Sequence, residues 1–120
     1  MNKKTLVLGA STKPERYSNM AIRKLRNYKH DTVAFGMREG EEHCVVIDTE
    51  LQDYKYIDTI TLYLNPKRQE QYYNYIVSLN PKRVIFNPGT ENPEFYNLLK
   101  ENNIEFEVAC TLVLLSTNQY

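Results

Sequence analysis

Residues 5–19, TLVLGASTKPERYSN, carry the clearest structural pattern in this chain. Residues 5–8 form a short apolar run that ends at Gly9, which is typical of a buried strand turning sharply into a loop. Residues 19–28 then carry apolar side chains at three- and four-residue spacing, which predicts an amphipathic helix. A buried strand followed by a helix is the repeating unit of parallel α/β folds.

The same alternation continues to the end of the chain. The expected strands are residues 32–35, 58–64, 83–86 and 105–108, and the expected helices are centred on residues 72–79, 95–99 and 111–115. Right-handed crossovers between parallel strands then limit the topology. We therefore predict one α/β domain over residues 1–120, with a Rossmann-like, doubly wound, mainly parallel sheet of five to six strands and helices on both faces.

One segment fits this alternation poorly. Only residues 37–43 separate Gly36 from Cys44, whereas a helical crossover between parallel strands usually needs a dozen or more residues. We expect residues 44–47 to form a short edge strand, and the sequence leaves its direction open.

Four of the five prolines follow an asparagine, and these pairs predict element boundaries. Asn at the N-cap followed by Pro at the first helical position is a good helix start, which suits Asn65 and Asn92. Asn80 is expected to end a helix, and Asn87 to turn the chain out of a strand.

Composition excludes some classes of function. Fifteen basic residues balance fifteen acidic ones, so no overall field favours nucleic acid or an anionic membrane, and neither partner is expected. The sequence has two cysteines, no pattern of a signal peptide and no apolar stretch long enough to span a bilayer, so we expect a cytoplasmic protein with free thiols. The ten tyrosines are expected mainly to pack, with a homodimer through a Tyr-rich surface as the alternative.

In an open parallel sheet, ligands bind outside the carboxyl ends of the strands, where the strand order reverses. Here that point is expected between the first strand and the strand at residues 58–64. Four loops would face it, at residues 9–18, 37–40, 65–68 and 87–92. Their candidate binding residues are Gly9, Ala10, Ser11, Lys13, Arg16, Tyr17, Ser18, Arg38, Asn65, Pro66, Asn87, Gly89 and Thr90.

The first of these loops suits a phosphate group. Gly9 permits a close approach of a ligand, and Ser18 or Asn19 can cap a helix whose N-terminus favours anions. Lys13 and Arg16 add positive charge. The loop is neither G-x-G-x-x-G nor a P-loop, and a plain strand–helix turn explains it about as well as a nucleotide site does.

The second and third loops bear on the identity of the nucleotide. NAD-binding folds place an acid after the second strand to hold ribose hydroxyls. Arg38 instead suits a phosphorylated ribose, as in coenzyme A or NADP, although Glu39 beside it keeps a solvated Arg38 as an open alternative. Lys67 and Arg68 oppose the dipole of the helix expected after Asn65, a conflict that a bound anion would relieve.

The common catalytic templates do not occur in this sequence. It contains no Gly-x-Ser-x-Gly, no Cys-x-x-Cys and no zinc-ligand spacing, so no metal site is expected. His30 and His43 stand alone. Cys110, which directly follows the last expected strand, is the only candidate nucleophile, and a buried, inert thiol is the favoured interpretation of it.

With these residues in view, the whole chain resembles the small stand-alone coenzyme A-binding domains, which are similar to the N-terminal Rossmann-like domain of succinyl-CoA synthetase α subunits. The order and spacing of several short motifs carry the resemblance. They are LVLGAS at residues 6–11, PERYS at residues 14–18, the Asn65–Pro66 joint, FNPGTEN at residues 86–92 and ACTLV at residues 109–113.

The resemblance implies that coenzyme A lies over the strand ends. Residues 9–11 and 16–18 would meet its phosphates, Arg38 its adenosine end, residues 65–66 the adenine or pantetheine, and residues 87–90 would lie further along. The synthetase also needs a phosphorylated histidine and a second domain, so we do not expect ligase activity. The expected function is binding of coenzyme A or acyl-CoA by a non-catalytic module. The alternatives are an NADP- or other nucleotide-binding protein, or a small thiol enzyme that uses Cys110.

Overall fold

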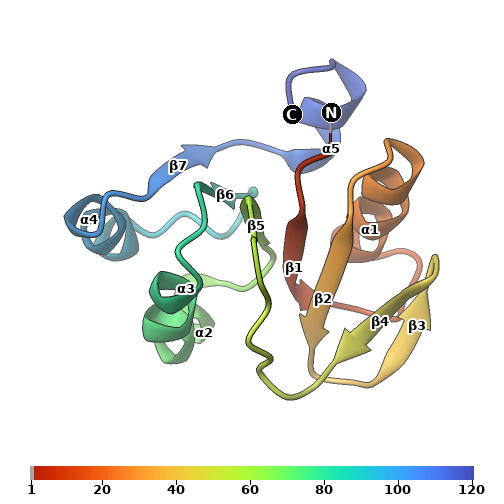
Figure 1. Ribbon diagram of the computed structural model, residues 1–120, viewed down its shortest axis with the longest axis horizontal. Helices are drawn as coiled ribbons and strands as arrows, with labels where there is room; N and C mark the ends of the chain where they lie inside the picture. The colour runs from red at the N-terminus through yellow and green to blue at the C-terminus, as the bar shows by residue number, and fades with distance from the viewer. Residues whose placement is uncertain (1) are drawn as a thin grey trace.

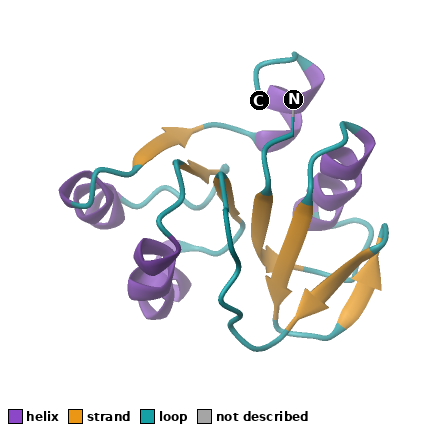
Figure 2. Cartoon of the chain, viewed as in Figure 1, coloured by secondary structure: helices purple, strands orange, loops and turns teal. Residues whose placement is uncertain are grey.

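The computed structural model describes residues 2–120 and contains a seven-stranded sheet in the order β3-β4-β2-β1-β5-β6-β7 (Figure 1). The strands are β1 (Thr5–Ala10), β2 (Thr32–Gly36), β3 (Gly40–Glu42), β4 (Val45–Asp48), β5 (Thr59–Leu62), β6 (Arg83–Phe86) and β7 (Glu105–Val108). The helices are α1 (Tyr17–Asn27), α2 (Pro66–Gln69), α3 (Tyr73–Leu79), α4 (Pro93–Glu101) and α5 (Thr111–Ser116), with the 3₁₀ turn η1 (Glu70–Tyr72) between α2 and α3. Figure 2 shows how these helices surround the strands.

The sheet is parallel throughout except where β3 meets β4. Strand β1 lies between β2 and β5, so the chain leaves β1 in one direction to build β2 and later resumes on its other side with β5. The strand order therefore reverses beside β1, where the sequence predicted it. The prediction of a Rossmann-like, doubly wound, mainly parallel fold is confirmed.

A β-hairpin replaces the helical crossover for which the sequence had no room. Strand β3 runs antiparallel to β4, and β4 then lies parallel to β2, with Ala34 opposite Ile47. The direction of the edge segment, which the sequence left open, is thereby settled. The sheet has seven strands, whereas five to six were predicted, because residues 40–42 of β3 were expected to form a loop.

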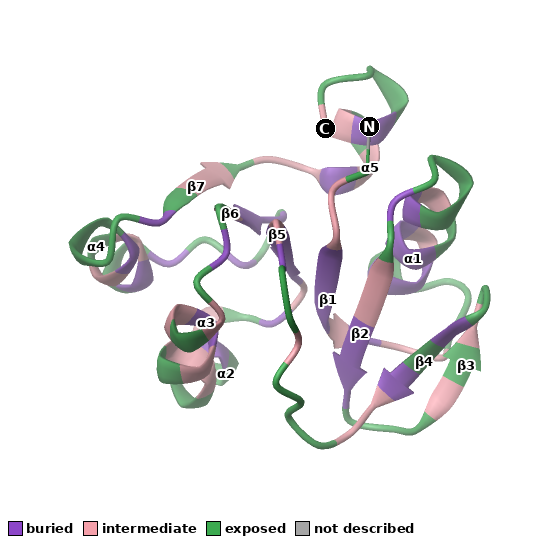
Figure 3. Cartoon of the chain, in the orientation of Figure 1, coloured by how far each residue is buried: buried purple, intermediate pink, exposed green. Residues whose placement is uncertain are grey.

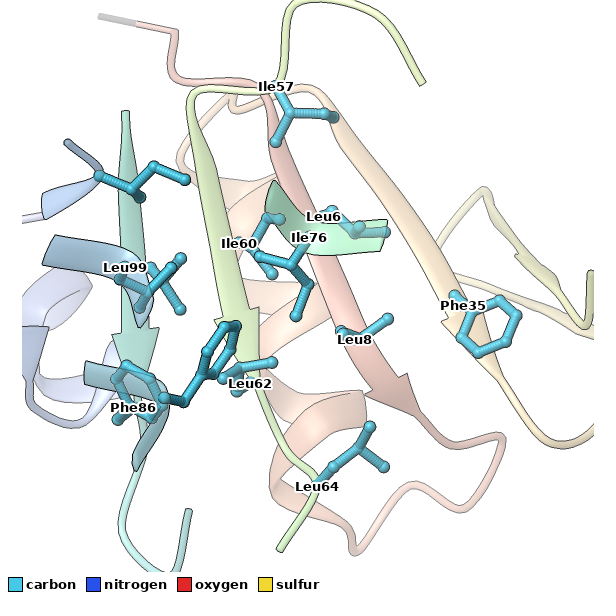
Figure 4. Close-up of a cluster of buried hydrophobic side chains, with 13 residues drawn as sticks. Leu6, Leu8, Phe35, Ile57, Ile60, Leu62, Leu64, Ile76, Phe86 and Leu99 are labelled. Carbon is cyan, nitrogen blue, oxygen red and sulfur yellow. The ribbon is translucent and has the colours of Figure 1, made fainter. Parts of the chain in front are cut away.

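Helices cover both faces of the sheet, because alternate residues of the central strands point to opposite sides. Figure 3 shows that β1, in the middle of the sheet, is buried over most of its length. On one face, Leu6 and Leu8 belong to a buried cluster with Ile76 of α3 (Figure 4), and this cluster also includes Phe95 of α4. On the other face, Val7 packs with α1 and α5 in a second cluster. The central strands are therefore packed between helices on both faces.

The asparagine–proline boundaries predicted from the sequence are confirmed at all four positions. Strand β6 ends at Phe86, and Asn87 begins the turn that follows it, with the Thr90 N–H donating to the Asn87 carbonyl oxygen at 3.0 Å. Asn65 Oδ1 accepts from the Arg68 N–H, and Asn92 Oδ1 accepts from the Phe95 N–H, so both residues cap the helices that follow them. Asn80 ends α3 in the left-handed conformation, with φ 49°. The helix expected at residues 72–79 begins earlier, as α2 and η1.

The tyrosines mostly cover the apolar cluster of the α3–α4 face. Tyr54, Tyr72, Tyr73 and Tyr75 are partly buried against it, whereas Tyr56 is almost fully exposed. Among residues 2–120, no helix is both long enough and apolar enough to cross a membrane.

Candidate ligand-binding cleft

A cleft of about 670 Å³ opens where β1, β2, β5 and β6 end, and its volume suits a small-molecule ligand. Most of the binding residues predicted from the sequence line it: Gly9, Ala10, Ser11, Lys13, Arg16, Tyr17, Ser18, Arg38, Asn65, Gly89 and Thr90. The structure thus brings together residues from all four predicted loops. Pro66 and Asn87 do not belong to its lining.

Two glycines let the backbone close tightly around the start of the cleft. Gly9 has φ 97° and interrupts the β1–β2 register, and a Cβ there would lie 3.0 Å from the backbone carbonyl of Tyr63. A Cβ at Gly36 would lie 2.3 Å from the Ala10 carbonyl oxygen, which no side chain could tolerate. The absence of side chains at these two positions therefore lets the end of β1 pack closely against both β2 and β5.

Helix α1 begins at the cleft without a side-chain cap. Its N-cap is Arg16, and no side chain accepts from the first turn, so the expected cap by Ser18 or Asn19 is wrong. The helix starts two residues before Asn19, which places Ser18 and Asn19 inside the first turn, where both are buried. The Tyr17 and Ser18 N–H groups have no intrahelical acceptor, whereas the Asn19 N–H donates to the Arg16 carbonyl oxygen at 3.1 Å. The first turn contains no acid. This helix end can therefore stabilise an anion.

All the charged side chains that line the cleft are positive. Lys13, Arg16, Arg38 and Arg68 line it, and none of its lining residues in the described part of the chain is Asp or Glu. None of these four side chains forms an ion pair with another residue of the 2–120 range. In a chain with equal numbers of acids and bases, four unpaired cations in one cleft are a local concentration of positive charge.

A second hollow, of about 880 Å³, lies at the opposite edge of the sheet, where β5, β6 and β7 begin, and its lining carries charges of both signs. Lys3, Lys82, Arg83 and Lys100 line it, but so do Asp58, Glu105 and Glu107. Arg83 is already paired with Glu107 at 2.9 Å. Although this hollow is larger, its charges are nearly balanced, so the cleft at the carboxyl edge is the better anion site.

Asn65 reaches the cleft while also capping α2, whereas Asn87 has a role inside the core. Asn87 is 2 % exposed. Its Nδ2 donates to Thr61 Oγ1 at 2.7 Å and to the Leu62 carbonyl at 2.8 Å, and its Oδ1 accepts from the Thr111 N–H at 2.9 Å. The side chain therefore joins the end of β6 to β5 and α5 and has no free group for a ligand.

A buried glutamine that the sequence analysis missed supports the far wall. Gln69 Nε2 donates to the carbonyl oxygens of Leu64 and Thr90, each at 2.8 Å, and its Oε1 accepts from Asn92 Nδ2 at 2.9 Å. These bonds hold the Thr90 loop against the end of β5. The only signal in the sequence is a polar residue on the inner face of a short helix, which is too weak to be recognised.

The apolar walls of the cleft were also missed. Phe35, Met37, Leu64 and Tyr72 line it, and the rings of Phe35 and Tyr72 meet edge to face with centroids 5.5 Å apart. Met37 is 74 % exposed. Tyr63 contributes as well, and burial raises the pKa of its phenol, which therefore stays neutral. Apolar surface beside cations suits a ligand that carries both phosphate and flat or aliphatic parts.

Cys110, the candidate nucleophile, lies outside the cleft. It is the N-cap of α5, is partly buried, and is absent from the lining residues described above. The hydrogen bonds among residues 2–120 include none to its thiol from an acid or a histidine. The structure thus supplies no base beside it.

The fold and the cleft together define a Rossmann-like domain with a site of the kind that accommodates phosphorylated cofactors. The chain belongs to the CoA binding domain family, whose model matches residues 3–116. This confirms the family resemblance drawn from the sequence motifs. Among curated proteins, no sequence matches this chain.

Solved structures share the fold over almost the full length. One, described as an uncharacterized protein, is 46 % identical, with a TM-score of 0.97 and coverage of 100 % of this chain and 99 % of the other. A protein from Thermus thermophilus, described as cell-free ID.343, is 24 % identical, with a TM-score of 0.85 and coverage of 98 % and 90 %. A hypothetical protein from Pyrococcus horikoshii OT3 is 24 % identical, with a TM-score of 0.86 and coverage of 96 % and 82 %. The last two likenesses concern the fold alone.

Proposed function

We propose that this protein binds coenzyme A or an acyl-CoA in the carboxyl-edge cleft, as a binding or accessory module without chemistry of its own. The observation that carries the proposal is a set of four cations, Lys13, Arg16, Arg38 and Arg68, which line a cleft with no acid and form no ion pair among residues 2–120. Membership of the CoA binding domain family supports the choice of ligand.

The residues present fit the parts of this ligand. Coenzyme A carries a pyrophosphate and a ribose phosphate, and the basic residues of the cleft come from two loops and from helix α2, so charge is available at separated points. The start of α1 adds backbone donors beside Arg16. Phe35, Met37 and Tyr72 offer apolar surface for the adenine and the pantetheine chain.

Two features support a binding role over a catalytic one. The described residues that line the cleft include no His, Cys, Asp or Glu, so the site lacks the side chains that most often carry out general acid–base catalysis near pH 7. Cys110 lies outside the lining. A bound coenzyme A would bring its own thiol, and the role of the protein would be to hold and orient that cofactor.

Calorimetric titration with coenzyme A, dephospho-coenzyme A and NADP tests this proposal. We expect coenzyme A to bind most tightly, because it alone of the three ligands carries the pyrophosphate, the ribose phosphate and the pantetheine chain. Tighter binding of NADP would move the assignment to a dinucleotide, since a phosphorylated ribose also satisfies Arg38. No binding of any of the three would overturn the proposal.

A further inference from the structure

The β3–β4 hairpin holds the loop between β1 and α1 through a buried asparagine. Asn19, in the first turn of α1, is 2 % exposed. Its Nδ2 donates to the Ser11 carbonyl oxygen at 2.9 Å and to Glu42 Oε1 of β3 at 3.0 Å. Its Oδ1 lies 3.2 Å from His43 Nε2. Every polar group of this amide is therefore used, and the amide joins three segments.

The hairpin touches the same loop at a second point. A Cβ at Gly40 would lie 2.5 Å from Thr12 Cγ2, so the backbone of β3 lies directly against the loop. The other hydrogen bonds of this loop are short-range: the Lys13 N–H donates to Ser11 Oγ, and the Arg16 N–H donates to the Lys13 carbonyl. Such local bonds leave the orientation of the whole loop to Asn19 and its neighbours in the hairpin.

We propose that Asn19, anchored by Glu42, is a positioning residue for the anion-binding loop of the cleft; this inference rests on the proposed function. A carbonyl oxygen turned toward the ligand would repel a phosphate. Asn19 engages the Ser11 oxygen in a hydrogen bond and so fixes the direction of that peptide group, while Ser11 itself lines the cleft. Glu42 orients the donating amide without lining the cleft.

Two possible roles of the Glu42 carboxylate predict opposite changes in the affinity for coenzyme A, so removing this group distinguishes them. If Glu42 acts only as a negative charge near an anion site, its removal should strengthen the binding of coenzyme A. If it acts by orienting Asn19, its removal should weaken binding. Glu41, the exposed residue before it in β3, carries the same charge and has no bond to Asn19, so it is the matched control.

The experiment compares Glu42→Ala, Glu42→Gln and Glu41→Ala by calorimetric titration with coenzyme A. Loss of one orienting hydrogen bond should weaken binding in Glu42→Ala by about five- to tenfold. Glu42→Gln keeps an acceptor for Asn19 Nδ2 and should bind within about twofold of the parent protein. Glu41→Ala should bind like the parent. Thermal unfolding of each variant verifies that it is folded.

Amide hydrogen exchange of residues 11–18 without ligand separates this inference from the proposed function. Glu42→Ala should speed exchange in this loop, whereas Glu42→Gln and Glu41→Ala should not. If the parent protein does not bind coenzyme A but the loop loosens in Glu42→Ala alone, the ligand assignment fails and the positioning role stands. The inference is overturned if Glu42→Ala changes neither exchange nor affinity, or if Glu42→Ala and Glu42→Gln both bind more tightly.

Discussion

Arg16 and Arg38 belong to different loops, and both are exposed, unpaired among the described residues, and part of the cleft lining. An exposed arginine without a carboxylate partner usually contributes little to folding. Beside a phosphate, the same guanidinium forms charge-assisted hydrogen bonds. These two residues therefore distinguish a binding site from a merely polar surface.

We expect Arg16→Ala and Arg38→Ala each to weaken coenzyme A binding by about ten- to a hundredfold, since a hydrogen bond to a charged group contributes roughly 1.5–3 kcal/mol. Arg38→Ala should harm binding of coenzyme A more than that of its dephospho form, whereas Arg16→Ala should harm both alike. Calorimetric titration of both ligands measures these differences.

Arg23→Ala, on an exposed position of α1 outside the cleft, is the control for a general loss of positive charge and should bind like the parent. Folding stability should change little in all three variants, because surface substitutions usually stay within about 0.5 kcal/mol. Unchanged affinity in both cleft variants would remove the phosphates from this part of the cleft.

At the scale of elements, the junction where α1 leads into β2 contains a histidine that must stay neutral. His30 is 7 % exposed, and its Nδ1 accepts from the Lys3 N–H at 2.9 Å. Burial, together with the charges of Lys3 and Arg83, lowers the pKa of His30 below its ordinary value of 6.5. A protonated imidazole could not accept this hydrogen bond.

This lowered pKa makes stability depend on pH. Below pH 6.5 the unfolded chain binds a proton at His30 that the folded protein resists, so the free energy of unfolding should fall as the pH drops from 7.5 to 5.5, by at most about 1.4 kcal/mol per pH unit. Urea unfolding at the two pH values measures the fall. His30→Asn, which keeps an acceptor but cannot titrate, should show a smaller fall than the parent.

The His30→Asn variant and the parent protein differ only at this position, so the comparison isolates the contribution of His30. If the stability of the His30→Asn variant fell with pH as steeply as that of the parent, another group would be responsible for the effect.

Some strands of the structure could be predicted from the sequence and others could not. Strands such as β1 and β6 could be predicted because short apolar runs of this kind are recognisable without tertiary information. Strand β3 could not, because Gly40–Glu42 consists of residues with little strand preference. Its turn to β4 places His43 and Cys44 at positive φ, where Asn-Gly would be the recognisable signal.

Most lining residues of the candidate site could be predicted from the sequence, because they lie in loops that follow the carboxyl ends of strands. Knowing that ligands bind at strand ends placed most lining residues, including Arg38 and Gly89. The role of Asn87 was not accessible, because its three partners come from β5 and from the start of α5. The support from Gln69 and Asn19 was hidden for the same reason: a buried hydrogen bond between distant segments leaves no local pattern.

At the scale of the whole molecule, the distribution of charge matters more than its sum. The balance of fifteen acids and fifteen bases predicts no particular partner, yet folding gathers four cations around one cleft and leaves mixed charges around the hollow at the opposite edge. Coenzyme A is therefore expected to bind in the smaller cleft, whose charged lining residues are all basic, and not in the larger hollow of mixed charge.

Titration of the ¹⁵N-labelled protein with coenzyme A, followed by amide chemical shifts, tests that choice most directly. We predict that the shifts concentrate in residues 9–18, 36–38, 65–72 and 88–90, and that residues 82–83 and 103–107 at the opposite edge stay unchanged. Shifts concentrated at residues 82–83 and 103–107, or an absence of shifts at saturating coenzyme A, would contradict the assignment of the carboxyl-edge cleft as the binding site.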